Sequence, residues 1–444
     1  MDWNGDGRRD VLVSQANGYL GVLLSTGTGL ASTVISTSYP TASIAYTAAP
    51  NLTGDGQDGL IAWTGTSATY YLHNDPGAPP DLLTSVADGY GNSVSPTYVS
   101  LSQNNYTESS GGDATYPYAD YIGPMYVVNE ALFSDPSSTG GTYNQTFWYY
   151  GAYVNLQGRG FQSFYAKRMI DSRNGLYYFQ YYERQFPESG MDFEDDLASS
   201  SGAQIAYSIR TPVVTTLSSA TNEQRYFPYF NNVTSNQYEL SGSEDGDLVT
   251  TTSTNYTYDN YGNATNIVST VTDEDPGSPY NGNTWTTNVT NTTDISINQS
   301  ADLAAWCLTM LDETQVVYTS TAAGSTSVTR TKVLTPDTPA SCRIKTIVTE
   351  PTANSGLFKV TEALTFDSFG NVWTDTVTGA NMPYSPASRL TTLNWGTTGQ
   401  YLDSSTDPSG AITTWVYSSA QSLAFGVPDS VKDALVQFRV FSGS

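Results

Sequence analysis

The first ten residues place oxygen-bearing side chains at intervals that suit a calcium-binding loop. Asp2, Asn4, Asp6 and Asp10 occupy positions 1, 3, 5 and 9 of this loop, and the glycines between them allow a tight backbone. A Ca²⁺ ion takes about six to eight oxygen ligands, and this spacing directs several of them to one centre. The loop therefore predicts a calcium site. The alternative is a set of Asx-type turns, in which the carboxylates accept hydrogen bonds from their own backbone.

A second loop repeats the pattern incompletely. Asn51, Thr53 and Asp55 keep the first three positions, whereas Asp58 stands one place early and Gly59 takes the ninth position. We predict calcium here as well, with the same alternative. The two loops start roughly 50 residues apart and each leads into a short apolar run, a pattern typical of β-propeller blades.

A cluster of carboxylates lies further along the chain, after a proline and beside a glycine. Its members are Glu188, Asp192, Glu194, Asp195 and Asp196. Paired carboxylates can hydrolyse glycosides or bind metal, but the flanking residues favour a solvated acidic loop. The sequence has no Gly-x-Ser-x-Gly elbow, His-Glu-x-x-His site or P-loop, and its single His removes most acid–base and triad designs. We therefore expect no catalytic residues and no enzyme.

Cys307 and Cys342 are the only cysteines of the chain. A disulfide between them would close a loop of about 35 residues and contribute roughly 4 kcal/mol by the chain-entropy estimate. Two cysteines and a single His are too few for a zinc site. The open alternatives are a disulfide, which an exported protein can form, and two buried free thiols.

A turn motif recurs in the C-terminal part of the chain. Residues 258–263 and 366–371 both read aromatic–Asp–polar–aromatic–Gly–Asn, and a shorter Asp-x-x-Gly skeleton recurs at 88–91 and 407–410. The motif residues are Asp259, Gly262, Asn263, Asp367, Gly370 and Asn371. The physical reading is a β-turn between two strands, with Asp accepting backbone hydrogen bonds at the first corner and Gly in the positive-φ position.

The elements that position these loops are predicted to be strands. Thr- and Val-rich runs flank the turns, and the aromatic runs 146–150 and 176–182 read as strands buried between layers. Residues 315–321 and 325–334 read as a hairpin. Helix is scarce, and 301–311 is the best helical candidate. The predicted fold class is all-β.

The composition excludes several classes of protein. Lys and Arg number 17 against 42 Asp and Glu, which gives a net charge of −25, and only 13% of residues are charged. Such a chain cannot neutralise many phosphates, so we expect no nucleic-acid binding. It has no apolar stretch of about 18 residues, so we expect no membrane span. Polar neutral residues and 33 Tyr fit an acidic, β-rich protein that is extracellular or on the cell surface.

The chain divides into three predicted segments. Residues 1–74 would form partial β-propeller blades, 75–243 an aromatic middle β region, and 244–444 a repeat region of β-strands. No signal peptide follows Met1. Since the chain begins within a repeat, we expect it to be a fragment of a longer polypeptide.

These motifs together resemble one family of bacterial toxins. The aromatic–Asp–x–aromatic–Gly–Asn units resemble the YD repeats of Rhs proteins, and the two N-terminal loops resemble FG-GAP/VCBS propeller repeats. The middle region is similar to that of the Tc toxin B component (TcdB/SpvB-like) at 157–161, 171–172 and 184–187. The segments 306–308 and 341–343 also resemble Rhs-repeat proteins. The order of the motifs matches across nearly the whole chain.

The resemblance implies a non-catalytic role in toxin delivery. In such proteins the YD repeats wind into a hollow β-shell around a C-terminal toxic domain, and the propeller gates the shell or docks it to a translocation component. The implied partners are the other segments of the parent toxin and that translocation component. This chain has too few YD units to close a shell and ends before any toxic domain. The alternatives are a calcium-dependent adhesin or wall-associated carbohydrate-binding protein and, less favoured, a secreted glycosidase.

Overall fold

The computed structural model describes most of the chain and is almost entirely β. The described residues are 1–41, 46–63, 65–71, 82–102, 105–108, 113–137, 140–220, 223–338, 341–352, 358–379, 388–434 and 438–440. They divide into two compact units, Met1–Thr251 and Thr252–Ser444. Among the described residues, no helix has the length and apolarity to cross a membrane.

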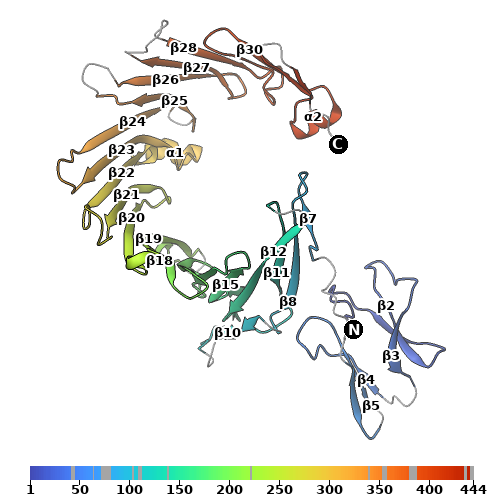
Figure 1. Ribbon diagram of the computed structural model, residues 1–444. Coiled ribbons are helices and arrows are strands. Elements are labelled where there is room, and N and C mark those ends of the chain that lie inside the picture. The colour runs from blue at the N-terminus through green and yellow to red at the C-terminus, as the bar shows by residue number, and fades with distance from the viewer. Residues whose placement is uncertain are drawn as a thin grey trace. The chain divides into compact units, whose positions relative to one another are not determined.

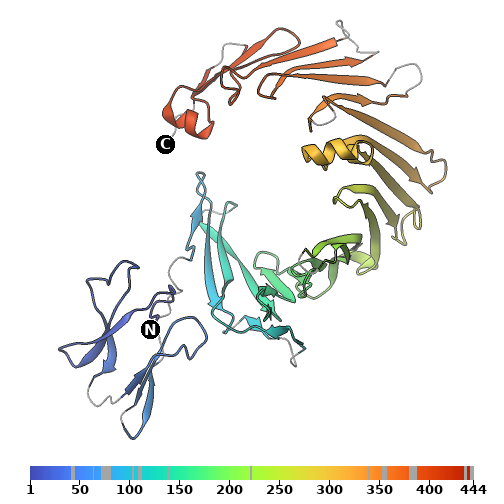
Figure 2. The ribbon, with the colours of Figure 1, turned by 180° about the vertical axis from the view of Figure 1, so that it is seen from behind.

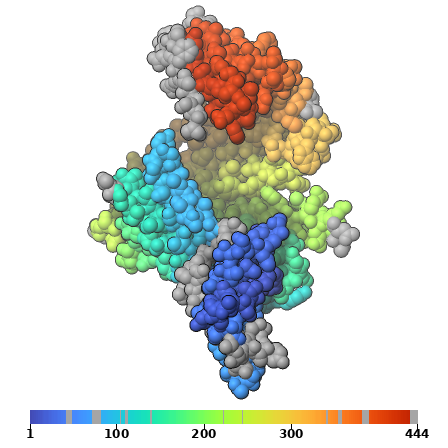
Figure 3. Space-filling model, turned by 90° about the vertical axis from the view of Figure 1, so that its right-hand side faces the viewer, coloured from blue at the N-terminus to red at the C-terminus, as the bar shows by residue number. Residues whose placement is uncertain are grey.

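The N-terminal segment of unit 1 forms two three-stranded antiparallel sheets. Their strands are β1 (Val11–Ser14), β2 (Tyr19–Leu23) and β3 (Ile35–Pro40), and β4 (Tyr46–Ala48), β5 (Leu60–Trp63) and β6 (Ala68–Tyr71). Leu20, Tyr39 and Leu60 are buried in one apolar cluster, against which Trp3 and Leu12 pack. The two sheets therefore share a core; their surface is blue in Figure 3.

The rest of unit 1 is a larger sheet that follows the chain. Its strands are β7 (Val86–Ala87), β8 (Ser93–Ser100), β9 (Tyr106–Thr107), β11 (Tyr126–Asp135), β12 (Gly141–Tyr150), β15 (Ala166–Asp171), β16 (Tyr177–Tyr182), β17 (Asp192–Ala198), β18 (Gln204–Ser218) and β19 (Arg225–Tyr238). From β11 on, each strand pairs with the next antiparallel, and β8 pairs with β7 and β11. A small separate sheet contains β10 (Tyr118–Asp120), β13 (Tyr153–Asn155) and β14 (Gly160–Ser163). The predicted strands at 146–150 and 176–182 are confirmed as β12 and β16.

Unit 2 is a succession of antiparallel hairpins, which Figure 1 shows in yellow to red. Its strands are β21 (Ala264–Asp273), β22 (Thr284–Thr293), β23 (Leu311–Ser320), β24 (Val328–Pro336), β25 (Ile344–Thr349), β26 (Val360–Phe366), β27 (Val372–Gly379), β28 (Ser388–Asn394), β29 (Ser404–Thr406), β30 (Ile412–Val416), β31 (Ser430–Lys432) and β32 (Phe438–Val440). Each pairs with the next along the chain. The boundary with unit 1 falls inside β20 (Leu248–Tyr258). The predicted hairpin of 315–321 and 325–334 is confirmed as β23 and β24.

Unit 2 has little buried interior. Within its described residues, the buried side chains are Thr293, Asp294, Ile295, Asp302, Cys307 and Ser422. Strand residues are otherwise half-buried or exposed, because water reaches both faces of the sheet. The Thr-rich strands suit this arrangement, since β-branched side chains favour the pleated backbone and the hydroxyl tolerates water.

Helices are few and short. Two single turns, η1 (Gly242–Glu244) and η2 (Asp294–Ser296), accompany α1 (Gln299–Ala305) and α2 (Ala420–Phe425). The helix predicted at 301–311 is only partly correct, because α1 begins earlier and stops at Ala305, where Trp306 takes a left-handed conformation (φ 62°). In both ribbon views α1 lies on one face of the sheet of unit 2 (Figures 1 and 2).

Two predicted segment boundaries stay predictions. The division at 74–75 lies outside the described residues. The division at 243–244 falls inside η1, a few residues before the boundary between the two units.

Candidate functional sites

The recurrent turns share one hydrogen-bonding pattern. At Asp259, one carboxylate oxygen accepts the N–H groups of Tyr261 (2.8 Å) and Asn263 (2.9 Å), and the backbone N–H of Gly262 donates to the carbonyl of Asp259 (3.3 Å). The second oxygen accepts the side-chain amide of Asn263 (2.8 Å). Gly262 has a φ of 89°, which favours glycine. Each turn is thus closed by its own Asp.

The other turns repeat these bonds. Asp367 accepts the N–H groups of the second and fourth residues after it, both at 2.9 Å, and so do Asp88 and Asp407 at 2.8 and 2.9 Å. The side-chain amide of Asn92 holds the pKa of Asp88 below its ordinary value, and the Ser409 hydroxyl does the same for Asp407. These Asp residues therefore act as charged acceptors that fix the turn.

Two of the turns also contact a later part of the chain. The side-chain amide of Asn263 donates to the carbonyl of Leu308, and that of Asn371 donates to the carbonyl of Gly399, each at 2.7 Å. The preceding aromatic residue contacts the same region: Tyr261 accepts a hydrogen bond from Gln299 (3.3 Å), and the Phe369 ring lies so close to Gly399 that a Cβ there would overlap it. The motif therefore both forms a turn and holds the connection that follows the second strand after it.

The structure joins Cys307 and Cys342 in a disulfide, with Cα atoms 5.3 Å apart. Cys307 is buried just after α1, whereas Cys342 is exposed before β25. The bond fixes the C-terminal end of α1 to the sheet.

The two N-terminal loops have matching local geometry. Asp2 accepts the N–H of Gly5 (2.9 Å) as Asn51 accepts that of Gly54 (2.7 Å), and Asp6 and Asp55 each accept the N–H two residues on (2.9 Å). A backbone bond closes each loop, from Asp10 to Met1 (2.6 Å) and from Gly59 to Pro50 (3.0 Å). Asn4 accepts the N–H of Asp6 (3.3 Å), and Thr53 donates to Asn51 (3.4 Å). These are the Asx-type turns that formed the alternative to calcium.

Asp10 and Asp58 bind backbone outside this repeated pattern. Asp10 is 5% exposed and accepts the N–H groups of Trp3 (2.8 Å) and Ser25 (2.7 Å). Asp58, which stands one place early, accepts the N–H of Asp2 and donates its own N–H to the Asp2 carbonyl, both at 2.7 Å. The early position thus joins the two loops. Calcium at either loop stays a prediction.

The acidic cluster does not lie on a loop as expected. Asp192, Glu194, Asp195 and Asp196 belong to β17, and only Glu188 precedes it in a turn. Pro187 and Gly190 favour a loop through the whole cluster, but only the turn at 188–190 is irregular. Residues from Asp192 onward form a strand because β17 pairs with both β16 and β18. Arg210 on β18 forms ion pairs with Asp192 (3.2 Å) and with Asp195. Burial, and then Asp195, raise the pKa of Asp192.

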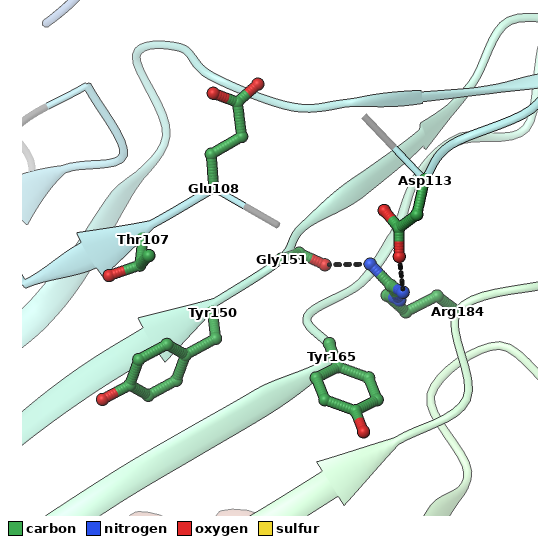
Figure 4. Close-up of a pocket in the computed structure, with 7 residues that line it drawn as sticks. All are labelled: Thr107, Glu108, Asp113, Tyr150, Gly151, Tyr165 and Arg184. Carbon is green, nitrogen blue, oxygen red and sulfur yellow. Dashed lines mark hydrogen bonds and ion pairs between the residues drawn. The ribbon is translucent and has the colours of Figure 1, made fainter. Parts of the chain in front are cut away.

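The sequence reading did not identify a polar pocket in unit 1 (Figure 4). It has a volume of about 480 Å³ and is lined by Thr107, Glu108, Asp113, Tyr150, Gly151, Tyr165 and Arg184. The Arg184 guanidinium donates to the Gly151 carbonyl and to the Asp113 carboxylate, each at 3.1 Å, and lies 3.8 Å from the centre of the Tyr153 ring. Glu108 turns away from Arg184. A second pocket, of about 460 Å³, shares Arg184 and Tyr165 with the first as lining residues.

Arg184 therefore links Gly151, which follows β12, with Tyr153 of β13 and with Asp113. The pocket is lined by carboxylates, phenols and a guanidinium that bonds Gly151 and Asp113. The only sequence signal was Arg184 itself, within 184–187. Its partner Asp113 is 71 residues away along the chain and carries no local motif.

Comparisons with known proteins find similarity in structure only. No family model matches the chain, and no curated protein matches it. A solved structure, the TcdB2-TccC3 crystal structure, matches with a TM-score of 0.67 and 12% identity over 99% of this chain. The chain spans 28% of the length of that chain. The crystal structure of a porin-like protein from Bacteroides uniformis ATCC 8492 covers 72% of this chain at 10% identity, but its TM-score of 0.20 is too low to indicate a shared fold. The likeness to TcdB2-TccC3 shows that this chain shares the all-β fold of the matching part of that structure.

Proposed function

We propose that this chain is a non-catalytic segment of the β-shell of a secreted bacterial Rhs/Tc-type toxin, which encloses and delivers a C-terminal toxic domain. The observation that carries the proposal is the fold likeness to TcdB2-TccC3, which extends over 99% of the chain. Its partners would be the other segments of the parent toxin and a translocation component. The N-terminal sheets would belong to the propeller, with calcium in their loops.

The hydrogen bonds of the turns support a structural role. Asn263 and Asn371 attach their turns to later connections, and the disulfide attaches α1 to the sheet. Such links stiffen a single-layer wall that has little buried interior of its own.

The environment of the carboxylates supports the absence of catalysis. Asp192 and Asp195 pair with Arg210, and the Tyr178 hydroxyl donates to Asp195 (2.9 Å). A glycosidase needs one carboxyl group free to protonate a leaving group and a second free to attack or activate water. Carboxylates committed to Arg210 do not suit either task.

The test is to express the whole gene that carries this chain and to examine the purified particle by electron microscopy and limited proteolysis. Proteinase K is the suitable probe, because the chain holds only 17 Lys and Arg for trypsin to cut. A hollow particle that protects an internal segment is the expected result. An open particle without a protected segment would contradict the shell. Binding of the isolated chain to cells or glycans, lost on chelation, would favour the adhesin.

A further inference from the structure

The buried interior of unit 2 contains two carboxylates. Asp294 opens η2 directly after β22 and is 1% exposed, and Asp302 lies in α1 and is 0% exposed. Ile295 and Cys307 are buried beside them in the chain. An apolar pair would be the ordinary choice for such positions, since burying a charge is costly unless it is paired.

Three oxygens of this pair have no hydrogen-bond donor in the described part of the chain, although the two carboxyl groups lie within hydrogen-bonding reach of each other. They are Oδ2 of Asp294 and both carboxylate oxygens of Asp302. Oδ1 of Asp294 accepts the side-chain amide of Asn298 (2.8 Å). Buried carboxylate oxygens in folded proteins nearly always have a partner, so three orphans at one place indicate that a cation or a proton shared by the two carboxyl groups is missing.

The surrounding charges increase the need for such a group. The carboxyl groups of Asp294 and Asp302 face each other, and Asp312 at the start of β23 adds a third carboxyl group close to Asp294. None of the ion pairs recorded among the described residues involves these three.

The spacing places three oxygen-bearing side chains in succession. Asp294, Asn298 and Asp302 follow at intervals of four, and the backbone N–H of Asp302 donates to the carbonyl of Asn298 (3.1 Å), so the last two lie one helical turn apart on the same side. A half-turn of the Asn298 amide would exchange its nitrogen for its oxygen at Asp294. The set then offers carboxylate and amide oxygens without a donor.

The backbone around these residues is held in place. The N–H of Asp294 donates to the carbonyl of Met310, and the N–H of Cys307 donates to the carbonyl of Asp302, each at 2.8 Å. The disulfide to Cys342 anchors the end of α1. The carboxylates therefore cannot relieve their repulsion by swinging into water without opening this region.

We propose that Asp294, Asn298 and Asp302 bind a calcium ion inside unit 2. All candidate ligands are oxygens, which Ca²⁺ prefers, and a bidentate carboxylate such as Asp302 suits its flexible geometry. Mg²⁺ keeps several waters and needs more room than a fully buried carboxylate leaves. No three His, Cys, Asp or Glu side chains form a metal-binding group in the described ranges, so this site depends on the Asn298 amide oxygen as its third ligand. This site is separate from the N-terminal loops and does not depend on the proposed function.

The test measures calcium binding by the intact chain after chelation, with Asp6→Ala as the background that weakens the N-terminal loop. Isothermal titration with CaCl₂ and the hydrogen exchange of residues 294–312 are the readouts. Calcium should slow exchange in this segment, and Asp302→Asn should weaken that site at least 10-fold without lowering the melting temperature of the calcium-free chain, because it removes one repelling charge.

The variant Asn298→Asp distinguishes a bound calcium ion from a proton shared by Asp294 and Asp302. With calcium bound through the amide oxygen, the added carboxylate strengthens binding. Without a cation, it adds a third negative charge beside the two buried carboxyl groups and lowers the melting temperature with or without calcium. Exchange at 294–312 that is indifferent to calcium in the unmutated chain overturns the proposal. In that case, a higher protection factor at 294–312 on acidification, taken relative to the intrinsic exchange rate at each pH, would assign the missing positive group to a proton shared by Asp294 and Asp302.

Discussion

The side-chain amide of Asn263 donates a 2.7 Å hydrogen bond to the carbonyl of Leu308, 45 residues further along the chain. The same amide bonds Asp259 within its own turn. One side chain thus closes a turn and attaches that turn to the segment that follows the disulfide-bonded Cys307. Asn371 does the same with Gly399.

Asn263→Ala should lower the free energy of unfolding of unit 2 by about 2 kcal/mol, because it removes two hydrogen bonds of about 1 kcal/mol each. Asn92→Ala is the matched control, since Asn92 bonds Asp88 in the same kind of turn and no long-range carbonyl is recorded for it among the described residues. Urea unfolding of both variants measures the difference. Equal losses would mean that the bond to Leu308 contributes nothing.

The N-terminal loops should respond differently to two substitutions. Asp10→Ala should destabilise this segment by about 2 kcal/mol with or without calcium, because two backbone N–H groups lose their acceptor. Asp6→Ala should act mainly by abolishing a calcium-induced rise in melting temperature. Thermal unfolding with CaCl₂ and with chelator distinguishes them. If calcium leaves the unmutated chain unchanged, the loops are Asx turns alone.

Reduction of the disulfide should destabilise unit 2 by roughly 4 kcal/mol on the chain-entropy estimate. Cys342 is exposed, so a thiol reductant can reach the bond without prior unfolding. The double variant Cys307→Ser/Cys342→Ser should melt at the temperature of the reduced chain and ignore reductant. A reduced chain as stable as the oxidised one would show that hydrogen bonds alone hold α1.

Asp171 should make unit 1 sensitive to acid. The Arg173 guanidinium lowers the pKa of Asp171 from 3.8 to about 2. A lowered pKa contributes stability above pH 3.8, and this contribution is lost as the pH falls towards 2. We expect a loss of about 1 kcal/mol, reduced because Arg173 is 52% exposed. Asp171→Asn should remove this dependence of the free energy of unfolding on pH. The same decline in the variant and the unmutated chain would mean that another group causes the acid sensitivity.

Arg184→Lys should destabilise unit 1 by about 2 kcal/mol. The planar guanidinium of Arg184 donates to both Gly151 and Asp113 and stacks on the Tyr153 ring. The single ammonium group of a lysine cannot make all three contacts at once. Asp113→Asn is the control and should cost less, because Asp113 is 52% exposed. Chemical denaturation measures both. A larger loss for Asp113→Asn would mean that the ion pair outweighs the bond to Gly151.

Local patterns were predictable and long-range partners were not. The turns at Asp259 and Asp367 depend on bonds within five residues, so composition and spacing suffice to predict them. The bond of Asn263 to Leu308 depends on which strands lie between, and no local rule encodes it.

The acidic strand shows a second limit of sequence reasoning. Asp192 to Asp196 resemble a loop in composition, yet tertiary pairing with β16 and β18 and the counter-charge of Arg210 make them a strand. In the sequence, Asp58 departs from the loop repeat by one position. In the structure it joins the two loops by accepting the backbone N–H of Asp2. In both cases the deciding partner lies far along the chain.

The single-layer sheet of unit 2 has a mechanical consequence. Its strands pair only with their neighbours along the chain, and few of its described side chains are buried. In such a linear array each hairpin is held mainly by the adjacent ones. Under tension from one end, the sheet would separate hairpin by hairpin, and the first large resistance would come where the Cys307–Cys342 disulfide links the chain across β23 and β24.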